Sequence, residues 1–384
     1  MKNMRIISIG IAIFAMLFGA GNVVFPLGLG RETGSNVAFA IIGLAITGIL
    51  VPLIGLISAT LFDGDYKRFL AMTGRVPGML VALVCMLLLG PFGATPRCIT
   101  LAYAAIKWHI PHLSLFFFSI IIAVVVFLAT MKKNYVVELL GKLLGPIKLL
   151  LLFSIVILGL LATTHPAPST FTPMASFIKG IHEGFWTLDL LATIFFSGLI
   201  VTSIKMSGQK SQKPLAPKEV LSIGIKAGAL GGILLGLVYT GFCLLAAKYG
   251  TSVANIPQDQ LLSALATLVL GPAASILANV TVATACLTTA MALTAVFADY
   301  LTHEIFMGKL NYHHALALTV ATTFGMTNLG FTGIKLIIEP VAVLCYPALV
   351  ALSIANMAHA LWGFRYVKSV TLMTFIATVA LKFV

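Results

Sequence analysis

Charged side chains are scarce in this chain, and acidic ones especially so. Only 9% of its 384 residues are Asp, Glu, Lys or Arg, with 11 acidic against 24 basic residues. Soluble domains carry about 25% charged residues, whereas 60% of this chain is hydrophobic. A soluble fold could not cover so much apolar surface. The composition therefore excludes a soluble globular protein and predicts an integral membrane protein.

Motifs that mark enzymes and metal centres are also missing. The sequence has no GxxxxGK[ST], HExxH or GxSxG pattern. The cysteines stand singly in apolar segments, without a CxxC pair: Cys85, Cys98, Cys243, Cys286 and Cys345. The basic excess lies mostly in short loops, where membrane topology explains it better than nucleic acid does. We therefore expect no enzyme, no organic cofactor and no nucleic-acid partner.

Long apolar runs alternate with short polar loops. A helix needs about 20 apolar residues to span a bilayer. The sequence therefore predicts an all-α integral membrane protein, one domain over 1–384, with about 11 spans at 6–30, 36–62, 77–106, 113–131, 147–164, 186–204, 220–247, 261–298, 312–328, 333–356 and 366–384. The run 261–298 is too long for one span, so we expect its first part to form a surface helix.

Lys and Arg lie mainly in the loops on the side of the N-terminus. The positive-inside rule therefore places the N-terminus in the cytoplasm. The chain begins MKNMR and runs into an apolar stretch without an A-x-A cleavage signal. This start predicts a retained first span instead of a removed signal peptide.

The first predicted span contains residues that disfavour a helix. In "FGAGNVVFP" (18–26), two glycines and Asn22 are followed by Pro26. Glycine costs a helix about 1 kcal/mol relative to alanine, and proline about 3. Close packing of small residues is one interpretation. The combination favours a true interruption, which survives at membrane depth only where it lines a cavity or is buried in protein.

A second interruption is predicted in the sixth span. In "LDLLATIFFSGLIVTS" (188–203), Ser197-Gly198 falls mid-span. Interruptions in spans one and six are typical of a five-plus-five inverted repeat, here 6–164 and 186–356, with 366–384 as an extra span. Such repeats bind ligands at the midplane, where half-helix N-termini face anions and freed carbonyls coordinate cations.

Span eight carries regularly spaced hydroxyl groups. Thr281, Thr284 and Thr288 recur at helical spacing in 278–300, with Thr289 beside the last. Helix packing explains such residues. Hydroxyl and carbonyl oxygens also suit a hard cation such as sodium.

Four charged residues fall within or at the edge of predicted spans: Arg97, Asp189, Lys335 and Glu339. Charges in a membrane default to a functional hypothesis. Lys335 and Glu339 are four residues apart and could pair on one helix. Arg97 could reach Asp189 or a substrate carboxylate. For Lys335 with Glu339, and also for Arg97, we favour a structural ion pair over a functional role.

Five stretches resemble the branched-chain amino acid:cation symporter family of bacteria. They are "FGAGNVVFP" (18–26), "LGPFGATPR" (89–97), "TLDLLATIFFSGLI" (187–200), "CLTTAMALTAVFADY" (286–300) and "TNLGFTGIKLIIEPVAVLCYPALVAL" (327–352). The resemblance implies uptake of leucine, isoleucine and valine by symport with sodium, or with protons, across the bacterial inner membrane. It also implies the leucine-transporter-like fold of the amino acid–polyamine–cation superfamily.

The resemblance also implies a set of site residues. The span-one break, whose amides meet the substrate carboxylate, is formed by Gly19, Ala20, Gly21 and Asn22. The span-six break, which takes the ammonium group and part of the side chain, is formed by Phe195, Phe196, Ser197 and Gly198. Sodium is held by the carbonyls of Ala15 and Phe18 and the hydroxyls of Thr288 and Thr289.

Two departures from the family keep alternatives open. Family members often carry a glutamate in span three where this chain has Ala104, which leaves the coupling ion open. Many relatives have a twelfth span outside the five-plus-five core, and we expect transport without it. The alternatives are another amino acid cargo, proton coupling, a non-transporting amino-acid sensor and a channel. A sensor would normally carry a soluble output domain, and a channel would favour a continuous polar pore.

Overall fold

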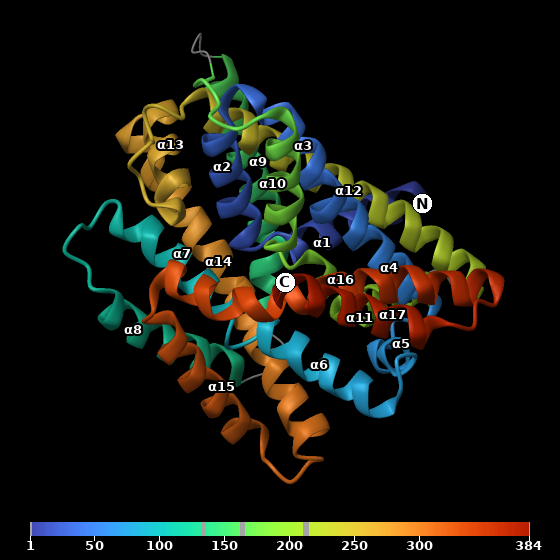
Figure 1. The fold of residues 1–384 in the computed structure, drawn as a ribbon. Helices are drawn as coiled ribbons and strands as arrows, with labels where there is room; N and C mark the ends of the chain where they lie inside the picture. The colour runs from blue at the N-terminus through green and yellow to red at the C-terminus, as the bar shows by residue number, and fades with distance from the viewer. Residues whose placement is uncertain (1, 132–135, 162–165, 210–214, 384) are drawn as a thin grey trace.

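The chain folds as a helical bundle (Figure 1). The computed structural model describes residues 2–131, 136–161, 166–209 and 215–383, and within these ranges every regular element is a helix. The α-helices are α1 (Lys2–Leu17), α2 (Gly21–Thr33), α3 (Val37–Ala45), α4 (Val51–Leu61), α5 (Tyr66–Ala71), α6 (Arg75–Leu89), α7 (Ala94–Lys107), α8 (Leu115–Met131), α9 (Val136–Leu161), α10 (Pro173–Phe185), α11 (Asp189–Gln209), α12 (Pro217–Lys248), α13 (Leu261–Leu270), α14 (Pro272–Tyr300), α15 (Tyr312–Thr327), α16 (Gly330–Trp362) and α17 (Val367–Phe383). Four short 3-10 or π segments complete the order: η1 (Gly34–Asn36), η2 (Ile46–Leu50), η3 (Gln258–Gln260) and η4 (Leu301–Ile305).

Many of these helices are long and apolar enough to cross a bilayer. Six helical segments, two of which contain short breaks, qualify by length and hydropathy: Gly21–Leu61, Arg75–Lys107, Pro173–Met206, Pro217–Lys248, Pro272–Ile305 and Gly330–Trp362. Shorter apolar helices cover Ile6–Leu17, Leu115–Met131, Leu149–Leu161 and Val367–Leu381. On α8, Phe117 and Leu128 are each more than 60% exposed, as expected of a helix that faces lipid. The chain is a multi-pass membrane protein, and the all-α prediction is confirmed. The predicted span 147–164 ends at residues outside the described part.

The interruption of the first span is confirmed. Helix α1 ends at Leu17 and α2 begins at Gly21, with residues 18–20 outside either helix. Pro26 lies inside α2 and does not end it. The glycines therefore break this span, and the proline follows within the second half-helix.

The third span is broken as well. Helix α6 ends at Leu89 and α7 begins at Ala94. A Cβ atom on Gly93 would lie 2.0 Å from the carbonyl oxygen of Leu88, so the turn between the two helices accepts only glycine there. This turn places Arg97 in the first turn of α7.

The sixth span is broken at a different place from the one predicted. Helix α11 runs without interruption through Phe195, Phe196, Ser197 and Gly198, so the predicted break there is wrong. The true break covers residues 186–188, between α10 and α11. Close packing explains the glycine at position 198, because a Cβ atom there would lie 3.0 Å from the carbonyl oxygen of Gly64.

The sixth span begins earlier than the predicted start at residue 186. Its first half is helix α10, which covers Pro173–Phe185. Thr172 caps this helix by accepting a hydrogen bond from the amide of Ala175 at 3.2 Å, and Pro173 occupies its first turn. Both are ordinary helix-start signals. The exact boundaries of the two repeats stay a prediction.

Helix α10 packs unusually close to α3. A Cβ atom on Gly180 would lie 2.1 Å from the carbonyl oxygen of Ala40, and one on Gly43 would lie 2.1 Å from that of Phe177. In η2, which follows α3, the hydroxyl of Thr47 donates to the carbonyl of Ile181 on α10 at 2.8 Å. Small residues let the two backbones touch, as is common between membrane helices.

The predicted subdivision of the run 261–298 is confirmed. Helix α13 ends at Leu270 and α14 starts at Pro272, with Gly271 between them at a φ of 81°.

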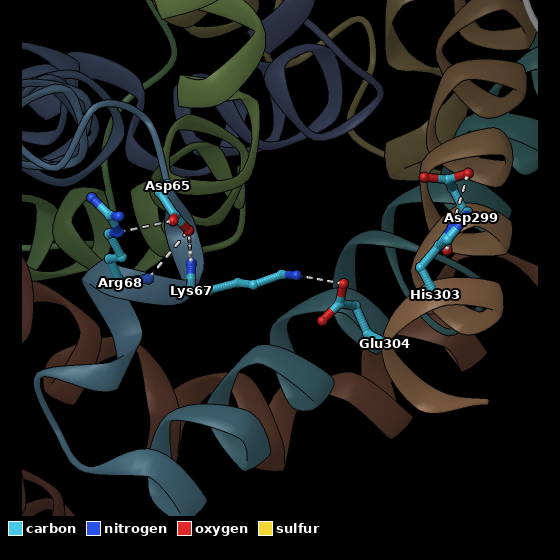
Figure 2. A network of polar contacts seen from close by, with 6 residues as sticks. All are labelled: Asp65, Lys67, Arg68, Asp299, His303 and Glu304. Atoms are coloured by element: carbon cyan, nitrogen blue, oxygen red, sulfur yellow. Dashed lines mark hydrogen bonds and ion pairs between the residues drawn. The ribbon is translucent and has the colours of Figure 1, made fainter. Parts of the chain in front are cut away.

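At the C-terminal end of α14, η4 is linked to α5 by an ion pair of 2.6 Å between Lys67 Nζ and Glu304 Oε1 (Figure 2). Both side chains are partly exposed, so this pair contributes at most about 1 kcal/mol.

The close approach of α10 and α3 gives a stability prediction. We expect Gly180→Ala to lower the free energy of unfolding by about 1–3 kcal/mol, because the added methyl group overpacks the interface. Gly325→Ala on α15 is the matched control, since a Cβ atom there meets nothing within 4 Å. Melting of both variants in detergent measures the difference. Equal melting temperatures would contradict the packing described here.

Candidate functional site

A cavity lies where the broken spans meet. Its empty space is about 440 Å³ when the open mouth is counted. Its lining comes from both half-helices of spans one and three, the start of α11, and α14. The lining residues are Met16, Leu17, Gly19, Ala20, Gly21, Asn22, Leu89, Ala94, Arg97, Cys98, Thr187, Leu188, Asp189, Ala192, Phe196, Thr289 and Leu293.

The breaks of spans one and six touch each other. A Cβ atom on Gly21 would lie 3.2 Å from both the carbonyl oxygen of Trp186 and the Cα of Thr187. The glycine therefore allows the start of α2 to approach the α10–α11 break. The four predicted span-one residues all line the cavity.

Buried polar side chains tie the two breaks together. The Nδ2 of Asn22 donates to both carboxylate oxygens of Asp189, at 2.9 and 2.8 Å, and also contacts the hydroxyl of Tyr239. The hydroxyl of Tyr239, on α12, donates to Asp189 at 2.7 Å. The amide of Gly19 donates back to the Oδ1 of Asn22 at 2.7 Å. This network fixes the carboxylate at the start of α11.

The N-terminus of α2 presents free donors. Within the described residues, the backbone amides of Ala20, Gly21 and Asn22 have no backbone acceptor. The first amides of any helix lack an intrahelical partner and carry partial positive charge. Since these three residues line the cavity, their amides are suited to an anionic group.

Arg97 is fully buried beside the same cavity. Its exposed fraction is 1%, and its Nη1 donates to the carbonyl of Trp186 at 3.0 Å. The guanidinium lies over the rings of Phe25 and Trp186, 5.2 and 5.8 Å from their centroids. Its Nε and Nη2 find no hydrogen-bond partner in the described structure. The ion pair with Asp189 that we favoured is wrong, because that carboxylate is held by Asn22 and Tyr239.

Lys335 approaches the same two rings. Its Nζ lies 5.8 Å from the centroid of Phe25 and 5.5 Å from that of Trp186. The ion pairs of the described side chains do not include one between Lys335 and Glu339, so the pairing that we favoured is wrong. The aromatic faces attract this cation instead. Lys335 is not part of the cavity lining.

Of the predicted span-six residues, the structure brings only Phe196 to the cavity. Phe195 packs against Tyr66, with 4.8 Å between ring centroids. The hydroxyl of Ser197 donates to the carbonyl of Ile194 at 2.6 Å, within its own helix. The residues that our reading of the sequence missed are Trp186, Thr187, Leu188 and Tyr239. The Thr172-Pro173 helix start could have revealed the earlier break, whereas nothing local marks Tyr239.

The predicted sodium ligands come together only in part. Thr289 lines the main cavity with Gly19. Phe18 lines a smaller adjoining hollow with Ala285 of α14. The hydroxyls of Thr288 and Thr289 both donate to the carbonyl of Ala285, at 2.8 and 3.1 Å, which leaves their oxygen lone pairs available.

Ala15 and Thr288 line neither hollow. Hydroxyl and carbonyl oxygens are nevertheless the ligand types that a hard cation prefers. The sodium site therefore stays a prediction.

The arrangement of the helices is that of a leucine-transporter-like fold. The inward-facing structure of Mhp1 superposes with a TM-score of 0.66 at 13% identity, covering 92% of this chain and 77% of Mhp1. MhsT in complex with L-phenylalanine superposes with a TM-score of 0.54 at 16% identity, covering 97% of each chain. At these identities the likeness shows the fold alone, and it confirms the predicted fold class.

The family follows from the sequence itself. The model of the family described as branched-chain amino acid transport protein matches residues 2–383, so the chain belongs to that family. It is 29% identical over 368 residues to the branched-chain amino acid permease BrnQ of Bacillus subtilis, covering 93% of this chain and 82% of the relative. The predicted family is confirmed, and so is the prediction that the chain is a transport protein and not an enzyme.

The buried network gives a second prediction. We expect Tyr239→Phe to lower the free energy of unfolding by about 2 kcal/mol, because Asp189 loses a buried donor. Tyr249→Phe is the matched control, since its hydroxyl makes only a 3.5 Å contact with the carbonyl of Gly159. Thermal melting of both variants in the same detergent checks the difference. A Tyr239 variant as stable as the control would show that the hydroxyl is not needed.

Proposed function

We propose that this chain imports leucine, isoleucine and valine by symport with sodium. The proposal places it in the bacterial inner membrane with its N-terminus in the cytoplasm, working by alternating access around the cavity. The observation that carries it is the meeting of three broken spans around one hollow that contains both charged and apolar groups. Broken spans at membrane depth are the usual binding elements of secondary transporters.

The apolar part of the lining supports an aliphatic cargo. Leu17, Leu89, Leu188, Ala192 and Leu293 surround the polar residues of the breaks. They offer a surface for a branched side chain and no partner for a polar one. Because one methylene changes affinity by only about 1–3 kcal/mol, we expect overlapping use of the three amino acids.

The coupling ion has two candidates. The hydroxyl of Thr289, which lines the cavity together with Gly19, and that of the preceding residue, Thr288, support sodium. The buried carboxylate of Asp189, which joins the two breaks, supports proton coupling as the second candidate. Either ion drives transport if it binds one of the two alternating states more tightly than the other.

Uptake of labelled leucine into proteoliposomes tests the proposal. We expect saturable uptake that an inward sodium gradient accelerates and that excess isoleucine or valine inhibits. If a proton gradient alone drives uptake, the coupling ion is the proton and not sodium. Flux that does not saturate would indicate a channel, and binding without flux a sensor. The absence of both binding and uptake would overturn the proposed cargo.

The sodium assignment gives its own prediction. We expect Thr288→Val with Thr289→Val to raise the sodium concentration for half-maximal uptake by about tenfold, because two hard oxygen ligands are lost. Thr284→Val is the control, one turn away on α14, with its hydroxyl bonded to the carbonyl of Val280. Sodium titration of initial uptake rates gives the comparison. An identical sodium dependence in the double variant would remove these hydroxyls from the site.

A further inference from the structure

Arg97 is a buried cation that forms no ion pair with the described side chains, and the carboxylate of Glu183 acts on it only from beyond ion-pair distance. Arg97 is 1% exposed, and Asp189, the carboxylate that shares its cavity, is engaged by Asn22 and Tyr239. An ion removed from water requires a partner of opposite charge or a full set of hydrogen bonds. Here only Nη1 has an acceptor, the carbonyl of Trp186.

The two nitrogens without partners share one edge of the guanidinium group. Nε and Nη2 direct parallel N–H bonds that match the two oxygens of a carboxylate. The bond from Nη1 to Trp186 and the contacts with two aromatic rings fix the plane of the group. A structural role accounts for Nη1 and for the ring contacts, but it gives Nε and Nη2 nothing to bind.

We infer that Arg97 binds the carboxylate of the transported amino acid through its Nε and Nη2, an inference that rests on the proposed function. The backbone amides at the start of α2, in the lining of the same cavity, supply neutral donors to the same group. Asp189 provides the opposite charge for the ammonium group, and the apolar lining takes the side chain. The charges of α7 and α11 thus orient a zwitterion within the cavity.

Binding of matched ligands to the purified full-length chain tests this assignment. Leucinamide keeps the ammonium group and side chain of leucine but replaces the carboxylate by a neutral amide. We expect the unmodified chain to bind leucine at least about 100-fold more tightly than leucinamide, because the amide leaves the buried cation unpaired. In Arg97→Gln, leucine affinity falls by at least about 100-fold while leucinamide affinity changes by no more than about threefold.

Two further variants separate recognition from folding. Arg97→Lys keeps the charge but loses the fork geometry, so the preference for leucine over leucinamide should fall by about tenfold and still remain. Lys335→Gln is the matched control: it removes the other cation near Phe25 and Trp186, yet lies outside the lining and should leave that preference unchanged. The melting temperature of each ligand-free variant reports its folding.

The outcomes distinguish the inference from the proposed function. An unchanged ratio of leucine to leucinamide affinity in both Arg97 variants would overturn the inference while leucine transport stands. Equal weakening of both ligands would assign Arg97 a structural role and also overturn it. If the unmodified chain binds another amino acid in place of leucine, the proposed cargo fails. The same comparison with that amino acid and its amide then tests Arg97.

Discussion

Lipid supplies no hydrogen bonds, and this constraint governs the arrangement of the whole bundle. Each interrupted span leaves peptide groups that need partners at membrane depth. The breaks of spans one, three and six therefore lie together, where Gly21 touches the turn at Trp186 and Asn22 reaches Asp189. Other groups remain without partners among the described residues, notably the first amides of α2 and one edge of Arg97. In our proposal, the transported amino acid supplies the partners that these groups lack.

The two charged side chains of the site, Asp189 and Arg97, do not contact each other because different neighbours hold each of them. The carboxylate of Asp189 is held by three hydrogen bonds from two other helices, whereas the guanidinium of Arg97 rests on aromatic rings and one carbonyl. Direct neutralisation of one by the other would have filled the cavity with an internal ion pair. In the proposed site, keeping them apart leaves two opposite charges for the ends of a zwitterionic substrate, at the expense of some stability.

Much of the fold could be predicted from the sequence, because hydropathy and helix breakers are local signals. The break at residues 18–20 follows from two glycines, Asn22 and Pro26 in one short stretch. Ser197-Gly198 misled the same reasoning, because a small pair in a membrane helix also serves close packing, and its partner Gly64 is remote in sequence. The partnership of Asn22, Asp189 and Tyr239 depends on how three helices are rotated about their axes. Periodicity alone does not give that rotation.

The glycine contact between α10 and α3 has a mechanical consequence. Helices α3 and α4 are joined through η2 into one continuous rod; α10 lies against its first part, and α11 meets its second part where Gly55 faces Leu190. Span two thus packs against the helices on both sides of the gap at residues 186–188 and holds them in line. Helix α12 braces span one in the same way, through Gly231 against α1 and Cys243 against Gly30. A change of angle at either gap therefore also moves the helix packed across it. The two halves of span six move together with span two, and those of span one move together with α12.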